Sequence, residues 1–168
     1  MKTLKHLLLA VFSLALVACG GEEKKEKETK VKISDTKVEK KVDENVSKVV
    51  ITGNDMMKFD KTEIRVKAGK KVKLTLRHIG KMDVNVMGHN VVILKQGVDV
   101  IAFAAKAATE KANGYIPTDS KDVIAYTEMI GGGQTTTIEF DAPAAGEYDF
   151  ICSFPAHYAM MKGKFIVE

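Results

Sequence analysis

Short runs of alternating apolar and polar residues follow one another from Lys48 to the C-terminus. The alternation is clearest in residues 49–51, 64–66, 72–76 and 148–152. Because successive side chains of a strand point to opposite faces, this period of two predicts strands with one buried face. Turn sequences separate the runs, as at Gly53-Asn54-Asp55, Ala68-Gly69-Lys70, Gly131-Gly132-Gly133 and residues 143–146. Seven or eight short strands punctuated by glycine and proline predict an all-β fold, a β-sandwich.

Two segments depart from this alternation. Residues 91–94 form an unbroken apolar run, which predicts a strand buried on both faces. Residues 98–111 are rich in alanine, and their apolar side chains recur at helical spacing before Asn113-Gly114. This second pattern predicts one helix inserted among the strands.

A thiol, an imidazole and a thioether lie close together near the C-terminus. Four residues separate Cys152 from His157, and three separate His157 from Met161. A loop this short can turn all three side chains toward one point. Two histidines and one cysteine in a trigonal site with a weak axial methionine form the blue-copper electron-transfer arrangement. His89, in the sequence Gly88-His89-Asn90, can supply the second imidazole, so we predict a copper protein that carries single electrons.

The first 18 residues have the pattern of an export signal. A basic start (residues 1–5) and an apolar stretch (residues 7–17) lead to Leu16-Val17-Ala18-Cys19. The apolar stretch is too short to span a membrane and is typical of a signal peptide. The Leu-Val-Ala-Cys sequence resembles the bacterial lipoprotein box, which implies cleavage before Cys19 and lipidation of Cys19. We therefore expect a lipid-anchored protein of the bacterial cell envelope, facing the periplasm or the cell surface.

Cys19 and Cys152 are the only cysteines of the chain. If Cys19 carries lipid, Cys152 is the one remaining thiol, and no disulfide can form within the folded domain. A free thiol is a liability in an oxidising compartment. A buried, inert cysteine is the general alternative, but the neighbouring His157 and Met161 favour a metal ligand.

Residues 19–47 carry the lipidated cysteine and a tether rich in lysine and glutamate, without aromatic residues. Such composition predicts a solvated linker, which as a flexible coil would span roughly 30 Å. The expected organisation is therefore signal peptide 1–18, lipidated cysteine and tether 19–47, and copper domain 48–168. The full chain has a formal charge of +4, and without Lys2 and Lys5 of the signal it has +2. No basic patch is interleaved with aromatic residues, so we expect no nucleic-acid partner.

Four stretches of the domain carry a family resemblance: residues 51–55, 86–90, 124–132 and 152–163. In order and spacing they resemble the azurins, which are type 1 blue-copper cupredoxins, and the similarity covers roughly residues 48–168. It implies a cupredoxin-like Greek-key β-sandwich that holds one copper ion, cycling between Cu(I) and Cu(II). It further implies that His89, Cys152 and His157 bind copper in one plane, with Met161 as the long axial ligand and the Gly88 carbonyl on the opposite side.

The same resemblance implies roles around the metal. Asn90 would join the two ligand loops, and the backbone N–H groups of Asn90 and Phe154 would point at the Cys152 sulfur. His78 resembles a histidine that lies near the azurin copper without binding it. An apolar patch for transient docking of redox partners would comprise Met57, Met82, Val86, Met87, Phe154, Pro155, Ala156, Ala159 and Met160. Ordinary core packing is the alternative for several of these side chains.

The chain departs from the azurin pattern at several positions. Ser47 and Lys70 stand where azurins carry a disulfide, and Val91 stands where they bury a tryptophan. Ala156 replaces a glycine of the copper loop. These differences bear on the reduction potential and on partner choice.

The leading hypothesis is a membrane-tethered electron shuttle that is not an enzyme, because the site offers no vacancy for a substrate. Its partners would be c-type cytochromes or a copper- or haem-containing reductase or oxidase. A copper-buffering or copper-delivery lipoprotein is an alternative, although the tether lacks the methionines and histidines that would favour it. A metal-free binding module is a further alternative, and the intact set of His89, Cys152, His157 and Met161 argues against it.

Overall fold

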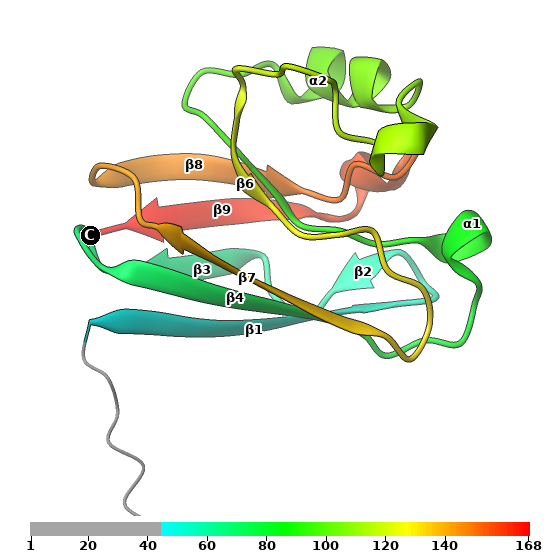
Figure 1. Cartoon of the computed structure of the whole chain (residues 1–168), viewed down its shortest axis with the longest axis horizontal. Coiled ribbons are helices and arrows are strands. Elements are labelled where there is room, and N and C mark those ends of the chain that lie inside the picture. Colours follow the sequence, from blue (N-terminus) through cyan, green and yellow to red (C-terminus); the bar gives the residue numbers. More distant parts are fainter. Residues whose placement is uncertain (1–44) are drawn as a thin grey trace, which may run out of the picture. The chain divides into compact units, whose positions relative to one another are not determined.

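The computed structural model describes residues 45–168, which fold into two packed β-sheets (Figure 1). One sheet has the strand order β2-β1-β4-β7 and the other the order β3-β9-β8-β5-β6. The strands are β1 (Val46–Asn54), β2 (Lys58–Phe59), β3 (Glu63–Val66), β4 (Lys71–His78), β5 (Val92–Leu94), β6 (Val123–Tyr126), β7 (Thr135–Asp141), β8 (Gly146–Ile151) and β9 (Lys162–Val167). The predicted all-β sandwich is confirmed, and the two-residue β2 takes the strand count one above the expected range. The signal peptide, Cys19 and nearly all of the tether lie outside the described residues.

Two parallel pairings join strands that are distant in the chain. β1 runs parallel to β4, with Ile51 opposite Leu76, and β3 runs parallel to β9, with Ile64 opposite Phe165. The remaining ladders are antiparallel, including β4 with β7 and β8 with β9. The alternation of β4 explains its placement, because Val72 and other inward side chains are buried while the lysines between them face solvent.

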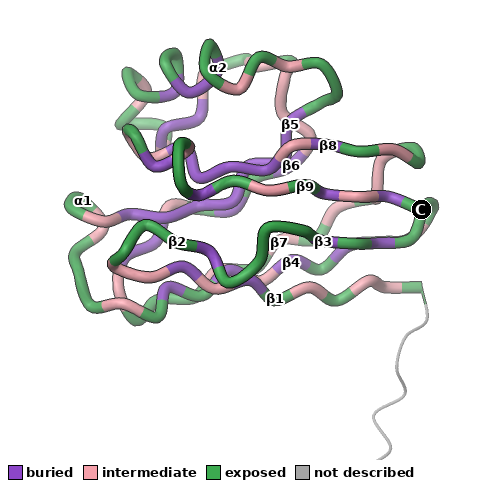
Figure 2. Tube along the Cα trace, turned by 180° about the vertical axis from the view of Figure 1, so that it is seen from behind, coloured by how far each residue is buried: buried purple, intermediate pink, exposed green. Residues whose placement is uncertain are grey.

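The main core fills the space between the two sheets. Ile51, Leu74, Phe150 and Phe165 are fully buried there, and burial of each such side chain contributes about 1.5–3 kcal/mol. Figure 2 shows the buried stretches gathered inside the molecule, with the turns and the outer side of α2 exposed. Tyr148 closes a turn within this fold by donating its hydroxyl to the Ala144 carbonyl at 2.8 Å.

A second core cluster lies between the five-stranded sheet and helix α2 (Val100–Ala107). Val92 and Leu94 of β5 pack there against Phe103 and Ala107. Ile93, on the other face of β5, belongs to the main core, so β5 is buried on both faces as predicted. The inserted helix also falls within the expected residues 98–111. Asp99 begins the helix by accepting hydrogen bonds from the backbone N–H groups of Ile101 and Ala102.

Three further short helical turns complete the fold: α1 (Val84–Met87), η1 (Lys111–Asn113) and η2 (His157–Ala159). Figure 1 shows α1 at one end of the sandwich, while β1 begins at the end where the C-terminus lies. Within residues 45–168, no helix has the length and apolar character needed to cross a membrane.

Candidate metal centre

His89, Cys152 and His157 meet at the end of the sandwich that carries α1. The antiparallel pairing of β5 with β8 sets Val92 opposite Ile151. His89 lies three residues before Val92, and Cys152 directly follows Ile151, so this register brings together residues 63 positions apart. His157 opens η2, the turn that follows Cys152 in the chain.

The three ligand atoms converge in the interior. The Cys152 Sγ lies 3.7 Å from Nδ1 of His157 and 4.0 Å from Nδ1 of His89, and all three atoms lie within 4.8 Å of one another. All three residues are buried. Trigonal coordination with metal–nitrogen and metal–sulfur bonds of about 2.0–2.3 Å separates the donor atoms by about 3.5–3.8 Å. The separations of 3.7 and 4.0 Å from the Cys152 Sγ are close to these values, so the three donor atoms can hold one metal ion after a small adjustment.

Burial sets the protonation of these groups. Burial raises the pKa of the Cys152 thiol to about 12, while the backbone N–H groups of Asn90 and Phe154 act in the opposite direction. Burial, followed by the nearby His89 and His78, lowers the pKa of His157 to about 4, and burial is also the main cause that lowers the pKa of His89. At neutral pH the imidazoles thus keep a lone pair for a metal, and a metal ion displaces the thiol proton when it binds.

The His89 ring is oriented by β1. Its Nε2 lies 2.9 Å from the Asn54 carbonyl, which can only accept, so Nε2 carries the proton and Nδ1 is left free toward Cys152. Gly53 permits this approach, because a Cβ on Gly53 would lie 2.7 Å from the His89 ring. β1 therefore determines which nitrogen of His89 faces the metal position.

His157 and Met161 are held by one tight loop. The backbone N–H of Met161 donates to the His157 carbonyl at 2.7 Å, and that of Cys152 donates to the Met161 carbonyl at 2.9 Å. Met161 is fully buried, and its terminal methyl lies 3.4 Å from the position of a Cβ on Gly53. The Met161 side chain thus reaches the same region as the His89 ring.

Asn90 joins the two ligand segments. Its Oδ1 accepts from the backbone N–H of Ser153 at 2.9 Å, and its Nδ2 donates to the Ser153 hydroxyl at 2.8 Å. Both residues are buried, so these bonds are shielded from water.

The Gly88 carbonyl oxygen lies 3.8 Å from the Cys152 sulfur. Gly88 has an ordinary extended backbone, and close packing is what requires a glycine there. A Cβ would lie 2.5 Å from the Val84 carbonyl, 2.9 Å from the Met129 sulfur and 3.0 Å from the Phe154 ring. These neighbours fix how closely the carbonyl approaches the metal position.

His78 does not join the ligand set. Its Nε2 bonds the Met87 carbonyl at 2.8 Å, and its Nδ1 accepts from the backbone N–H of Gly80 at 3.1 Å. Its ring stacks on that of His89 with centroids 4.3 Å apart. Both nitrogens of His78 are thus engaged with backbone groups, and its ring supports the ligand His89.

Comparison with known proteins identifies the family. The sequence matches the family model described as copper binding proteins of the plastocyanin/azurin family over residues 45–168. This chain belongs to the plastocyanin/azurin family. Copper is therefore the metal for this plastocyanin/azurin-type centre, in agreement with its soft thiolate and two imidazole donors.

Individual members of the family are similar over most of the domain. Azurin-1 of Alcaligenes xylosoxydans xylosoxydans is 48% identical over 119 residues, covering 68% of this chain and 92% of that protein. Auracyanin-A of Chloroflexus aurantiacus is 37% identical over 112 residues, covering 66% of this chain and 67% of that protein.

Solved structures agree with this assignment. The azurin iso-2 of Methylomonas sp. strain J has a TM-score of 0.66 at 32% identity, covering 72% of this chain and 97% of that chain. Auracyanin A of Chloroflexus aurantiacus, described as a blue copper protein, has a TM-score of 0.67 at 31% identity, covering 73% of this chain and 99% of that chain.

The expected docking patch is accessible to solvent: each of its nine residues is exposed or partly buried. Met87, Phe154 and Pro155 are partly buried, and the exposed members are Met57, Met82, Val86, Ala156, Ala159 and Met160. Phe154 packs against the main core, as the core-packing alternative expects, whereas Met57, Met82, Val86, Ala156, Ala159 and Met160 are exposed.

Four neighbours of the centre were missed by sequence reasoning. Gly53 and the Asn54 carbonyl contact His89, the Tyr115 ring packs edge-on against Phe154 at 5.2 Å, and Met129 packs against Gly88. Residues 51–55 were noted in the sequence as a family-like stretch, which was the available signal for the first two. Residues 124–132, another family-like stretch, include Met129 and were the available signal for it, whereas no family-like stretch includes Tyr115.

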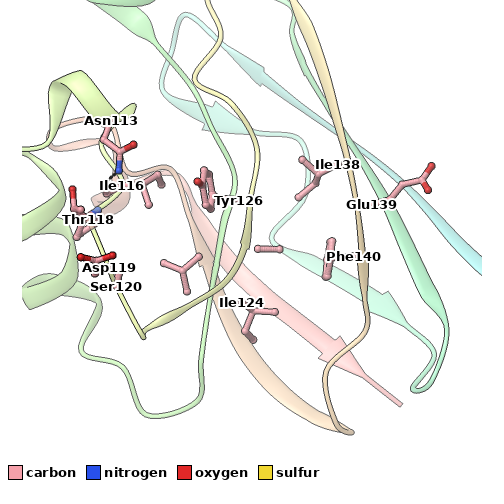
Figure 3. A pocket seen from close by; sticks show the side chains of 13 residues that line it. Asn113, Ile116, Thr118, Asp119, Ser120, Ile124, Tyr126, Ile138, Glu139 and Phe140 are labelled. Atoms are coloured by element: carbon pink, nitrogen blue, oxygen red, sulfur yellow. Dashed lines mark hydrogen bonds between the residues drawn. The ribbon is translucent and has the colours of Figure 1, made fainter.

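The cavity drawn in Figure 3 is separate from the copper centre. It has a volume of about 440 Å³ and lies between the segment that includes Asn113 and Thr118, strand β6 at Ile124 and strand β7 at Ile138 and Phe140. None of the ligand residues lines it. This cavity therefore gives no access to the copper position.

Proposed function

We propose that this chain is a blue copper electron carrier, tethered to a membrane by lipid on Cys19. The observation that carries the proposal is the convergence of one buried thiol and two buried imidazole nitrogens within 4.8 Å. Copper in such a ligand set exchanges single electrons between its Cu(I) and Cu(II) states. In this proposal the Met161 thioether would be a further, weaker ligand, and the Gly88 carbonyl would lie near the copper.

The residues around the copper supply rigidity. Asn54 holds His89, Asn90 holds the copper loop at Ser153, and the Met161 backbone bonds both Cys152 and His157. A site held by this many backbone contacts changes little when the charge of the metal changes. Small rearrangement between oxidation states favours fast electron exchange.

The apolar patch around His157 supports transient docking. We propose c-type cytochromes or a copper- or haem-containing reductase or oxidase as partners. Electron-transfer complexes have small interfaces, and methionine side chains adapt to different partner surfaces. Exposed methionines such as Met82 and Met160 suit this use.

The position of β1 supports the tether. β1 begins at the end of the sandwich opposite α1, the end where the C-terminus lies (Figure 1). A lipid-bearing segment would therefore join the folded domain at the end away from α1 and the ligand residues. Labelled fatty acid should attach to the wild-type chain and not to Cys19→Ala, and equal labelling of both would refute the anchor.

Stopped-flow mixing of the reduced full-length chain with an oxidised c-type cytochrome tests the electron-carrier proposal. We expect one electron per chain to pass while the copper stays bound, as measured by metal analysis after gel filtration. Val86→Glu, within the docking patch, should slow the transfer and leave the visible spectrum unchanged. Ile101→Glu, at an apolar side chain on α2 that is 66% exposed and outside the patch, is the matched control. Transfer of copper in place of electrons would instead indicate a copper-delivery protein.

A further inference from the structure

The methionines of the described domain are all found on the loops and turns around the copper end. Methionine usually fills gaps in a hydrophobic core, yet in residues 45–168 only Met161 is buried. The others are partly or largely accessible: Met56, Met57, Met82, Met87, Met129 and Met160. Core packing therefore does not explain why this end carries so many thioethers.

Three of these thioethers lie on two loops that are clamped together. Met56 and Met57 follow β1, and Met82 precedes α1. The Asp55 carboxylate accepts from the backbone N–H groups of Lys81 at 2.7 Å and Met82 at 3.3 Å. The N–H of Ile79 also donates to the Gly53 carbonyl at 2.8 Å. Met82 is therefore fixed beside the Asp55-Met56-Met57 turn although 24 residues of sequence separate it from Met57.

The three side chains are open to solvent. Met56 is 75% exposed, Met82 is 44% exposed and Met57 is 36% exposed. Each methionine side chain has three rotatable bonds, so thioethers from the two clamped loops can turn toward one ion. The Asp55 carboxylate adds a negative charge where the two loops are joined. Hydrogen bonds from the backbone of Lys81 (the largest cause) and Met82 lower its pKa.

We propose that Met56, Met57 and Met82 form a second copper site that binds Cu(I) at the surface. Thioethers are soft ligands that select Cu(I), and they carry no proton, so binding neither releases a proton nor changes the oxidation state. This site is distinct from the buried centre. The Met57 N–H donates to the Asn54 carbonyl that also accepts from His89 Nε2, which places the turn on the side of His89 away from Cys152. The inference does not depend on the electron-carrier proposal.

Silver(I), a soft closed-shell stand-in for Cu(I), provides the test. The full-length chain is first given one equivalent of Cu(I) to fill the buried centre and is then titrated with silver(I) while its methionine methyl signals are followed by NMR. We expect the methyl signals of Met56, Met57 and Met82 to shift together and to saturate at one added equivalent. Those of Met87 and Met129 should stay in place.

The triple variant Met56→Leu/Met57→Leu/Met82→Leu should lose this second equivalent while its Cu(II) form keeps the visible spectrum of the buried centre. Leucine conserves volume and apolar character, so the docking patch is preserved. Met160→Leu, which removes a 70% exposed thioether on another loop, is the matched control and should retain the second equivalent. Met82→Leu alone tests the site should the triple variant fail to fold. Absence of a saturable second equivalent of silver would overturn the proposal. Shifts of the methyl signals that include Met160 and do not saturate would indicate adventitious binding only, and would overturn it as well.

Discussion

Ala156 holds a left-handed backbone conformation directly before the ligand His157. Its φ is 66° and its ψ is −12°, a region that costs an L-residue with a Cβ roughly 1–2 kcal/mol. The copper loop therefore keeps a strained residue at the position where the azurin pattern has glycine.

Ala156→Gly should raise the free energy of unfolding of the metal-free chain by about 1 kcal/mol, because glycine adopts this conformation without a Cβ penalty. Chemical denaturation measures the change. Ala159→Gly is the matched control: it lies in the same turn without a positive φ and should lower stability. Loss of stability in both variants would contradict the argument from strain.

At the residue scale, the spacing of the ligand residues could be read from the sequence, but the backbone conformation of the copper loop could not be predicted from it. The intervals between Cys152, His157 and Met161 indicated a soft-metal loop because ligands so close in sequence can converge. His89 was identified by its chemistry and by family resemblance, since no spacing rule connects it to Cys152. The αL conformation of Ala156 and the proton on His89 Nε2 depend on the surrounding fold, so sequence could not reveal them.

At the scale of elements, the copper centre depends on the link between the segment before β5 and the loop after β8. Asn90 provides that link through hydrogen bonds to the backbone N–H and the hydroxyl of Ser153. Both partners are buried, so removal of the Asn90 amide leaves the Ser153 N–H and hydroxyl unsatisfied.

Asn90→Ala should lower the free energy of unfolding by about 1–3 kcal/mol, the cost of unsatisfied buried polar groups. It should also alter the visible spectrum of the Cu(II) form, because the copper loop is no longer held. Asn85→Ala is the control: the exposed Asn85 bonds only the Asp83 side chain at the surface, and its loss should change stability within about 0.5 kcal/mol. Equal effects of the two substitutions would rule out the proposed link.

Sequence patterns predicted elements best where they were long or strongly periodic. The alanine-rich run of residues 98–111 predicted α2, and the apolar run of residues 91–94 predicted β5. α1 was missed because its four residues make only about one helical turn, too short for an apolar side chain to recur on the same face, although its cap Asp83 was a readable start signal. The two-residue β2 exists only through its pairing with the end of β1. The parallel pairing of β1 with β4 is likewise a tertiary property that alternation does not encode.

At the scale of the whole molecule, folding creates the complete ligand set. His89 lies 63 residues before Cys152, and the pairing of β5 with β8 brings the His89 Nδ1 to 4.0 Å from the Cys152 Sγ. Copper bound by this full set stabilises the folded chain more than the unfolded chain.

Copper should therefore raise the midpoint of thermal unfolding, and its removal by a chelator should reverse the change. At free copper 100-fold above its dissociation constant, the stabilisation is about 2.7 kcal/mol if the unfolded chain does not bind. Differential scanning calorimetry measures it. Cys152→Ser should show a much smaller increase, and an equal increase would place the bound copper elsewhere.

The visible absorption spectrum of the full-length chain after addition of Cu(II) tests the central claim most directly. If copper is bonded to the Cys152 thiolate together with His89 and His157, the Cu(II) form should show an intense blue band. The band should vanish on reduction and be absent from Cys152→Ser. A colourless Cu(II) complex, or an equally blue Cys152→Ser variant, would contradict the assignment of this centre.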